Sequence, residues 1–234
     1  MNTIFPFRLQ ELIEKLDKIN EIDGFLLSDL LAGSEISAAD LEPFATFDHS
    51  PSESYGRKLL YENGRFKILL MSWLPGDFTA IHNHGTSEWG SVRVFGSTSH
   101  RLYQFDNQIL RLIEADTYPN GHVTTVFGDL IHMMGNSGSK SFTSLHVYGS
   151  NSKNPATQEN AKIYIPELKR VVETAGEAFL SLKRELILSE SEFTGFDPDA
   201  MADYLKLVKP FYIRNNKIEI LDRVPEYHHQ TATC

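Results

Sequence analysis

The sequence predicts a mainly β protein with flanking helices, in which an antiparallel barrel or jelly roll forms the middle of the chain. From residue 55 to residue 148, short apolar or alternating runs are separated by Gly, Asn, Asp and Pro, which is typical of antiparallel strands. Before this region apolar residues recur at spacings of three and four, as on one face of a helix. With 234 residues, of which 41% are hydrophobic and 23% charged, the chain can bury one full core.

Three helices are predicted before the strands. The first covers residues 7–20, where the apolar residues repeat with helical spacing. The second covers residues 25–31 and ends at Gly33, and the third begins at Ser37, a residue type that caps helix N-termini. We therefore assign residues 1–54 to helices that pack on the barrel.

Short strands are predicted along the middle of the chain, at residues 67–73, 91–95, 101–105, 108–113 and 123–127. Asp106-Asn107 is expected to form the turn of a hairpin. We assign residues 55–150 to the barrel and expect it to carry the functional site.

After residue 150 the sequence indicates helices again. A long helix is predicted over Glu167–Leu188 and another over Pro198–Lys209, with proline in the first turn. Residues 225–234 are expected to be frayed, with His228-His229 as a solvated pair. We assign residues 151–234 to a helical C-terminal segment of the same single domain.

The composition of the chain argues against several classes of function. The formal net charge of −9 argues against nonspecific binding of nucleic acid, which requires clustered Lys and Arg. The single cysteine, Cys234, cannot form an internal disulfide. The longest apolar run, Ile68–Leu74, is far shorter than the ~20 residues of a membrane-spanning helix. Because charged residues occur early in the chain, we expect no secretory signal and a cytoplasmic location; the oligomeric state stays open.

The strongest functional signal is the pair His82-Asn83-His84, followed by His132. Two histidines at positions i and i+2 of a strand point to the same side of the sheet. A neighbouring strand that carries His132 would complete a face of three nitrogen ligands, and neutral imidazole suits iron, copper, nickel or zinc. Such a face leaves coordination positions open for a substrate, so a metal enzyme is the leading interpretation.

A second signal lies in the predicted strand at residues 143–148. Its side chains alternate, so Ser144, His146 and Tyr148 share one face. A hydroxyl, an imidazole and a phenol are costly to bury unless each finds a partner. If this face looks into the barrel, it forms part of a site.

Together these motifs resemble the thiol dioxygenases of the cupin superfamily, most closely the cysteine dioxygenase type. The resemblance covers roughly residues 38–150. Four elements in family-like order and spacing carry it, namely Tyr55-Gly56-Arg57, Gly76-x5-His82-x-His84 with Gly96 after it, His132-x3-Asn136, and Ser144-Leu145-His146-Val147-Tyr148. The resemblance implies a cupin-type antiparallel jelly-roll barrel. It also implies an enzyme that oxidises a small thiol carboxylate, with L-cysteine expected, to its sulfinic acid with O2.

The resemblance further implies Fe(II) held by His82, His84 and His132. Three neutral imidazoles leave the full double positive charge on such an ion, which favours an anionic thiolate. By the same resemblance, Arg57 and Tyr55 bind the substrate.

The remaining site residues also follow from the resemblance. Tyr148 orients substrate and O2, tethered through His146 and Ser144. A guanidinium is a suitable bidentate partner for a carboxylate, and a phenol can donate a proton or a hydrogen bond. The expected partners are thus a small thiol and O2, without nucleic acid or membrane.

Several positions depart from the family pattern. Trp89 stands where mammalian members have a cysteine cross-linked to the triad tyrosine, so no cross-link can form. Gly149-Ser150-Asn151 resembles bacterial 3-mercaptopropionate dioxygenases, yet those enzymes generally carry Gln at the place of Arg57. Cysteine and 3-mercaptopropionate therefore both stay open as substrates.

Two other functions stay open. Glu88 lies close to the His82-x-His84 pair, where most cupins place a fourth, carboxylate ligand. With Glu88 as a ligand, the protein would be a different cupin enzyme, such as an isomerase or a carbon-cleaving dioxygenase. A third possibility is a sensor module without enzymatic activity.

Overall fold

The computed structural model describes residues 4–152 and 160–224. It begins with helices α1 (Phe7–Lys18), α2 (Gly24–Ala32) and α3 (Ala38–Leu41) and the 3-10 turn η1 (Glu42–Phe44). The Asp23 side chain accepts a hydrogen bond from the Leu26 amide at the start of α2, and Ser37 and Asp40 form a capping box at the start of α3. The three predicted N-terminal helices are therefore confirmed. In the described part of the chain no helix is long and apolar enough to cross a membrane.

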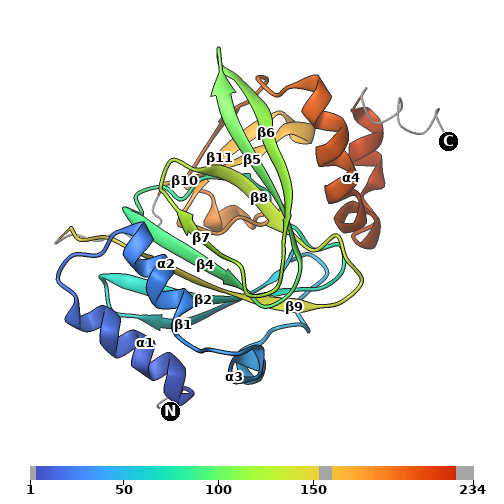
Figure 1. The fold of residues 1–234 in the computed structure, drawn as a ribbon. Coiled ribbons are helices and arrows are strands. Elements are labelled where there is room, and N and C mark those ends of the chain that lie inside the picture. The colour runs from blue at the N-terminus through green and yellow to red at the C-terminus, as the bar shows by residue number, and fades with distance from the viewer. Residues whose placement is uncertain (1–3, 153–159, 225–234) are drawn as a thin grey trace.

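Twelve strands of the described residues form two antiparallel sheets (Figure 1). The five-stranded sheet has the order β1 (Gly56–Glu62), β2 (Phe66–Trp73), β9 (Phe142–Gly149), β4 (Trp89–Val94) and β7 (Val123–Val126). The seven-stranded sheet has the order β12 (Ser189–Glu192), β11 (Arg170–Thr174), β10 (Ala161–Ile165), β3 (Ile81–His82), β8 (Ile131–Gly135), β5 (Thr98–Asp106) and β6 (Ile109–Tyr118). The predicted fold class, mainly β with antiparallel sheets and flanking helices, is confirmed.

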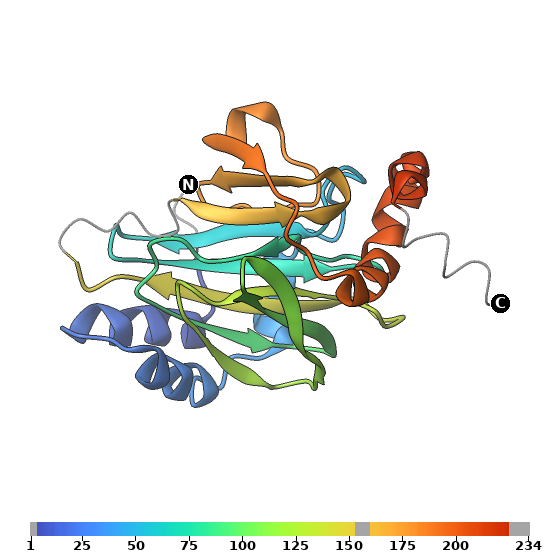
Figure 2. The same cartoon turned by 90° about the horizontal axis from the view of Figure 1, so that it is seen from above.

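The helices cover the outer faces of the two sheets, as Figures 1 and 2 show. Leu12 and Leu16 of α1 pack in one apolar cluster with Ile68 and Leu70 of β2. The intervening Leu69 packs in a different cluster, which lies between the sheets. Successive residues of β2 face opposite sides of the sheet. Because an apolar cluster covers each side, β2 is buried along its whole length.

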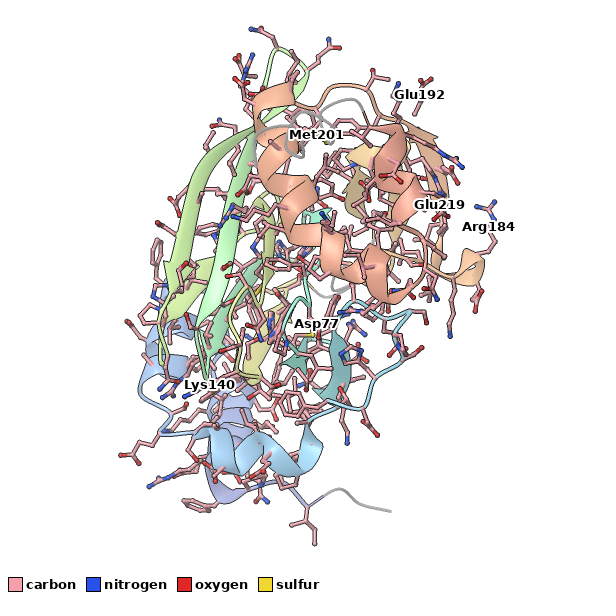
Figure 3. All side chains as sticks on the ribbon, turned by 90° about the vertical axis from the view of Figure 1, so that its right-hand side faces the viewer. Asp77, Lys140, Arg184, Glu192, Met201 and Glu219 are labelled. Atoms are coloured by element: carbon pink, nitrogen blue, oxygen red, sulfur yellow. The ribbon has the colours of Figure 1, made fainter. Side chains whose placement is uncertain are left out.

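The helix α4 (Pro198–Arg214) covers the seven-stranded sheet. It packs its apolar residues with Met133 of β8 and Ile163 of β10. His132 and Met134, on either side of Met133, therefore project to the inner face of this sheet. Figure 3 views the molecule from the side of α4, with Met201 labelled on this helix.

The predicted helix over Glu167–Leu188 is wrong. This stretch contains the 3-10 turn η2 (Pro166–Leu168), strand β11 and a second 3-10 turn, η3 (Arg184–Leu186). Lys169 is left-handed, with φ of 51°, which ends η2, and the β-branched pair Val171-Val172 suits a strand. Through β10, β11 and β12 the larger sheet continues past residue 150.

Two predicted boundaries also need correction. The β5–β6 hairpin turns at Asn107-Gln108, with φ of 48° and 68°, one residue later than expected. Helix α4 does not stop at Lys209 but runs through Pro210 to Arg214, after which the 3-10 helix η4 (Ile218–Arg223) follows. The prediction for His228-His229 lies outside the described residues.

Candidate metal centre

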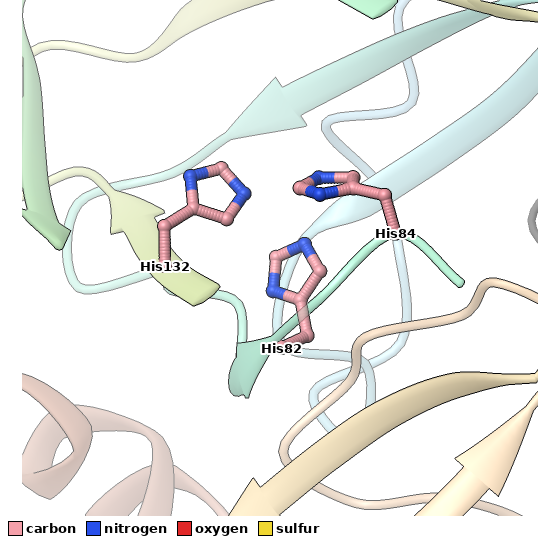
Figure 4. A group of neighbouring side chains, drawn as sticks. All are labelled: His82, His84 and His132. Atoms are coloured by element: carbon pink, nitrogen blue, oxygen red, sulfur yellow. The ribbon is translucent and has the colours of Figure 1, made fainter. Parts of the chain in front are cut away.

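The three predicted ligand histidines lie together inside the barrel. Strand β3 pairs with β8 so that His82 stands directly opposite His132, and His84 follows β3 two residues later. One ligand nitrogen of each ring lies within 4.8 Å of those of the other two, and all three residues are buried (Figure 4). This is the one such group of three or more His, Cys, Asp or Glu residues in the described part of the chain.

The protonation of these rings suits a metal. Burial lowers the pKa of His82 to about 4 and that of His84 and His132 well below the ordinary value, so the imidazoles are neutral. The Nδ1 atom of His82 lies 2.9 Å from the Ala80 carbonyl, to which it donates, leaving Nε2 free to ligate. The Nε2 atoms of His84 and His132 are buried without a hydrogen-bond partner among the described residues. A metal cation bound between the three rings would give these nitrogen atoms a partner.

A fourth histidine, His100 of β5, supports this cluster. Its Nε2 atom lies 2.9 Å from Nδ1 of His132, and its Nδ1 atom lies 3.3 Å from the Tyr118 hydroxyl. His100 is not part of any motif that the sequence predicts to be functional. Its position follows from the pairing of β5 with β8. No local sequence motif predicts this pairing.

The second predicted motif forms a buried hydrogen-bonded chain beside the histidines. Trp73 Nε1 donates to Ser144 Oγ at 2.9 Å, Ser144 Oγ lies 2.7 Å from His146 Nε2, and His146 Nδ1 lies 2.9 Å from the Tyr148 hydroxyl. The Tyr148 ring stacks on His84, with 5.3 Å between ring centroids. Trp73 was not predicted as part of this chain; it reaches Ser144 because β2 and β9 are neighbours.

Two arrangements of protons are compatible with this row of hydrogen bonds. Burial lowers the pKa of His146 to about 3 and raises that of Tyr148 above its ordinary value, so both side chains are uncharged. In the first, Ser144 accepts from Trp73 and donates to His146 Nε2, and Nδ1–H of His146 donates to the Tyr148 oxygen. In the second, Ser144 accepts from both Trp73 and His146 Nε2–H, and the Tyr148 hydroxyl donates to His146 Nδ1. Only the first arrangement leaves the Tyr148 hydroxyl hydrogen to donate elsewhere.

These groups line one cavity, which the structure assembles from both sheets and from the segment after β11. Its lining includes the three histidines, His146, Tyr148, Tyr55, Trp73, Met71, Met134, Gly176 and Ala178. Tyr55 is buried, stacks on Trp73 and accepts a hydrogen bond from the Ala178 amide at 3.3 Å. Burial raises the pKa of Tyr55 to about 12.

Two other candidate site residues, Arg57 and Glu88, each contact another residue of the protein. Nη1 of Arg57 lies 3.6 Å from Oε1 of Glu177, which belongs to none of the predicted motifs. Oε2 of Glu88 accepts a hydrogen bond from the Asn151 amide at 2.6 Å, and Glu88 is not part of the histidine cluster. A carboxylate occupied in this way gives no support to a four-ligand site.

Known proteins are similar to part of this chain. The model of the cysteine dioxygenase type I family matches residues 3–155, which include the helices α1 to α3, strands β1 to β9 and the three histidines. Among solved structures, a conserved protein with a double-stranded β-helix domain from Klebsiella pneumoniae is 18% identical, with a TM-score of 0.38, and the match covers 51% of this chain and 94% of that one.

Two further solved structures show comparable similarity. An RmlC-like cupin protein from Desulfovibrio desulfuricans is 16% identical over 41% of this chain and 81% of that one, with a TM-score of 0.33. A cupin superfamily protein from Desulfitobacterium hafniense is 17% identical over 41% of this chain and 76% of that one, with a TM-score of 0.32.

Proposed function

Because the chain belongs to the cysteine dioxygenase type I family, we propose that it is an Fe(II)-dependent thiol dioxygenase. Its substrate would be a small thiol carboxylate, with L-cysteine as the first candidate. The observation that carries this proposal is the cluster of three buried, neutral histidines beside the chain from Trp73 to Tyr148. The reaction is balanced without a further reductant, since a thiolate and O2 give a sulfinate that contains both oxygen atoms.

The donor set fits a divalent iron ion. Imidazole is a suitable ligand for Fe(II), and His82, His84 and His132 would hold it. Bound there, the ion would supply the redox chemistry that O2 requires and would lower the pKa of a ligating thiol. The three ligands bring no negative charge, so the site favours an anionic sulfur ligand.

The side chains beside the histidines can orient the substrate and O2 through hydrogen bonds. When Ser144 donates to His146, the Tyr148 hydroxyl is left as a donor beside His84. A neutral phenol held in this way can donate to a polar atom of the substrate or of O2 and can hold a proton at that atom. Tyr55 and Trp73 are buried and form part of the cavity wall.

The test is oxygen uptake by the iron-loaded protein with L-cysteine, with the product identified by mass. We expect uptake and a product heavier by two oxygen atoms. Tyr148→Phe should lower the rate by about 10²-fold or more and leave bound iron unchanged. Tyr61→Phe, which alters a hydroxyl bonded to Asp17 on the far side of β1, should retain full activity. Bound iron with no uptake of O2 with L-cysteine or 3-mercaptopropionate would contradict the proposal.

A further inference from the structure

A second cavity lies inside the barrel, on the side of His132 that contacts His100. Its volume is about 190 Å³, whereas the cavity that contains the three histidines has about 20 Å³. Its walls come from β4 and β7 of one sheet and from β5, β6 and β8 of the other, so it lies between the sheets. Its apolar lining consists of Val92, Val94, Leu102, Val126, Leu130 and Met134.

Two residues of β8 belong to the walls of both cavities, namely His132 and Met134. The His132 ring is held by its contact of 2.9 Å with His100. Met134 has an unbranched thioether side chain, which adapts its shape by rotation about three bonds. Met134 is therefore the part of this shared wall that can move aside and connect the second cavity with the histidine cluster.

The second cavity suits a small uncharged molecule. Thr98 Oγ1 donates to the Gly135 carbonyl at 2.9 Å, so this hydroxyl is already bonded within the protein. The Tyr118 hydroxyl lies 3.3 Å from both His100 Nδ1 and Glu114 Oε1. Glu114 is exposed, so its end of the cavity faces solvent. A charged ligand would lose hydration here and gain few partners, and an anion would also be repelled by the Glu114 carboxylate.

The cavity that contains the histidines offers little room for two molecules to enter together. With about 20 Å³ of free space, it would be filled by a bound thiol, which would then obstruct the same entrance for O2. O2 is small, uncharged and apolar, so it is favoured in apolar surroundings over water. The second cavity would bring it to the histidine cluster from another side.

We propose that the second cavity is a binding site and entry route for O2, which reaches the histidine cluster past Met134. The identity of the gas rests on the proposed function. The binding of a small apolar molecule in the second cavity does not, because it depends only on the walls described above.

The experiment fills the second cavity by Thr124→Trp. Thr124 lies opposite Val92, and both residues line the cavity. Thr124 is half-buried on the edge strand β7, which β4 separates from His146 on β9, so the larger ring can be added without replacing any residue of the histidine cluster. Oxygen uptake is measured at varied O2 with the iron-loaded protein and saturating L-cysteine.

We expect kcat/KM for O2 to fall by about tenfold or more, because a close-packed interior leaves no void for the gas to cross. Bound iron and the KM for L-cysteine should stay at their wild-type values. Val123→Trp is the matched control. Val123 is the neighbour of Thr124 on β7, but it packs with the apolar cluster that contains α1 and does not line the second cavity. This control should keep the wild-type kcat/KM for O2.

Two kinetic results would overturn the inference. An unchanged kcat/KM for O2 in folded Thr124→Trp would show that O2 enters elsewhere. A rise in the KM for L-cysteine as large as that for O2 would show that the second cavity is not selective for the gas.

A second measurement separates this inference from the proposed function. Xenon binds in apolar cavities, so crystals of the wild type and of Thr124→Trp are placed under xenon pressure. We expect a xenon atom in the second cavity of the wild type and none there in the variant. If xenon binds but no thiol is oxidised in air, the proposed function fails and the site for a small apolar molecule stands. If thiols are oxidised but the second cavity of the wild type takes up no xenon, the proposed function stands and the entry route is overturned.

Discussion

The Nε2 atom of His100 lies 2.9 Å from the Nδ1 atom of His132, so a side chain of β5 orients a candidate metal ligand of β8. The contact fixes the His132 ring and directs its Nε2 atom towards His82 and His84. A hydrogen bond to the second nitrogen of a ligating histidine commonly fixes its tautomer and strengthens its binding to metal. His100 therefore holds the ring of His132 in its position within the histidine cluster.

From this contact we predict that His100→Ala weakens metal binding by about 10- to 100-fold. The reason is that the His132 ring would lose its fixed orientation, while its Nε2 atom would remain available. Affinity is measured by competition with a chromophoric chelator, with Zn²⁺ as the probe. His122→Ala is the control, because His122 stacks on Tyr118 at 4.1 Å without bonding to a ligand histidine. Equal affinities in all three proteins would contradict the prediction.

Sequence patterns predicted the parts of the fold that depend on local signals. Caps and apolar spacing located α1 to α3, and alternation located the central strands. The region after residue 165 was misread because Val171, Val172 and their apolar neighbours also fit a helical spacing. The left-handed Lys169 and the pairing of β11 with β10 decide the structure there, and both depend on tertiary context.

The same limit applies to the site. The close spacing of His82 and His84 is visible in the sequence, and the structure brings His132 to them. Trp73 and His100 reach the site only through pairings between strands that are distant in the sequence. No local spacing could have identified these two residues.

The backbone of β4 at Gly90 lies close to the ring of Tyr148. Gly90 of β4 stands opposite Tyr148 of β9, and a Cβ atom at Gly90 would lie 2.6 Å from the tyrosine Cδ1 atom. We predict that Gly90→Ala lowers the free energy of unfolding by about 1–3 kcal/mol through overpacking. It should also reduce thiol oxidation, because the ring must move from its place beside His84.

Urea denaturation measures the first effect and oxygen uptake the second. Gly33→Ala is the control: Gly33 has φ of −83°, and the nearest atom to an added Cβ would be the Asp29 carbonyl oxygen at 3.4 Å. If Gly90→Ala were as stable and active as this control, the tight contact with Tyr148 would not matter.

The buried carboxylate of Glu167 depends on two tyrosines of α4. Tyr204 donates its hydroxyl to Oε2 at 2.7 Å, and Tyr212 donates to Oε1. Burial raises the pKa of Glu167, an effect that both hydrogen bonds oppose. Tyr204→Phe should therefore destabilise the protein by about 1–3 kcal/mol, since it removes a partner from a buried polar group.

Tyr103→Phe provides the contrast. The Tyr103 hydroxyl is buried and has no hydrogen-bond partner among the described residues, so its removal should be neutral or stabilising. Both variants are compared by urea denaturation at neutral pH. Equal losses would mean that the contacts of Glu167 contribute nothing specific.

A buried ionic network joins the loop before β1 to α4. Asp77 is fully buried, and Figure 3 shows it below α4. Its Oδ2 atom lies 3.0 Å from His49 Nε2, and its Oδ1 atom lies 2.8 Å from Arg214 Nη1. The hydrogen bond to Asp77 raises the pKa of His49, against opposing effects of burial and of Arg214. Protonated His49 is thus favoured by the folded state.

This raised pKa determines how stability should depend on pH. A group whose pKa is higher in the folded state stabilises fully below its unfolded pKa of about 6.5, and the gain is lost as pH rises through the folded pKa. The difference in free energy of unfolding between the wild type and His49→Gln should therefore be larger at about pH 5.5 than at about pH 9. In an Asp77→Asn background the same substitution should give a difference that no longer varies with pH, because the carboxylate that favours the protonated ring is gone. Urea denaturation across this range measures both pairs. A wild-type difference that is constant with pH would show that Asp77 does not hold the proton on His49.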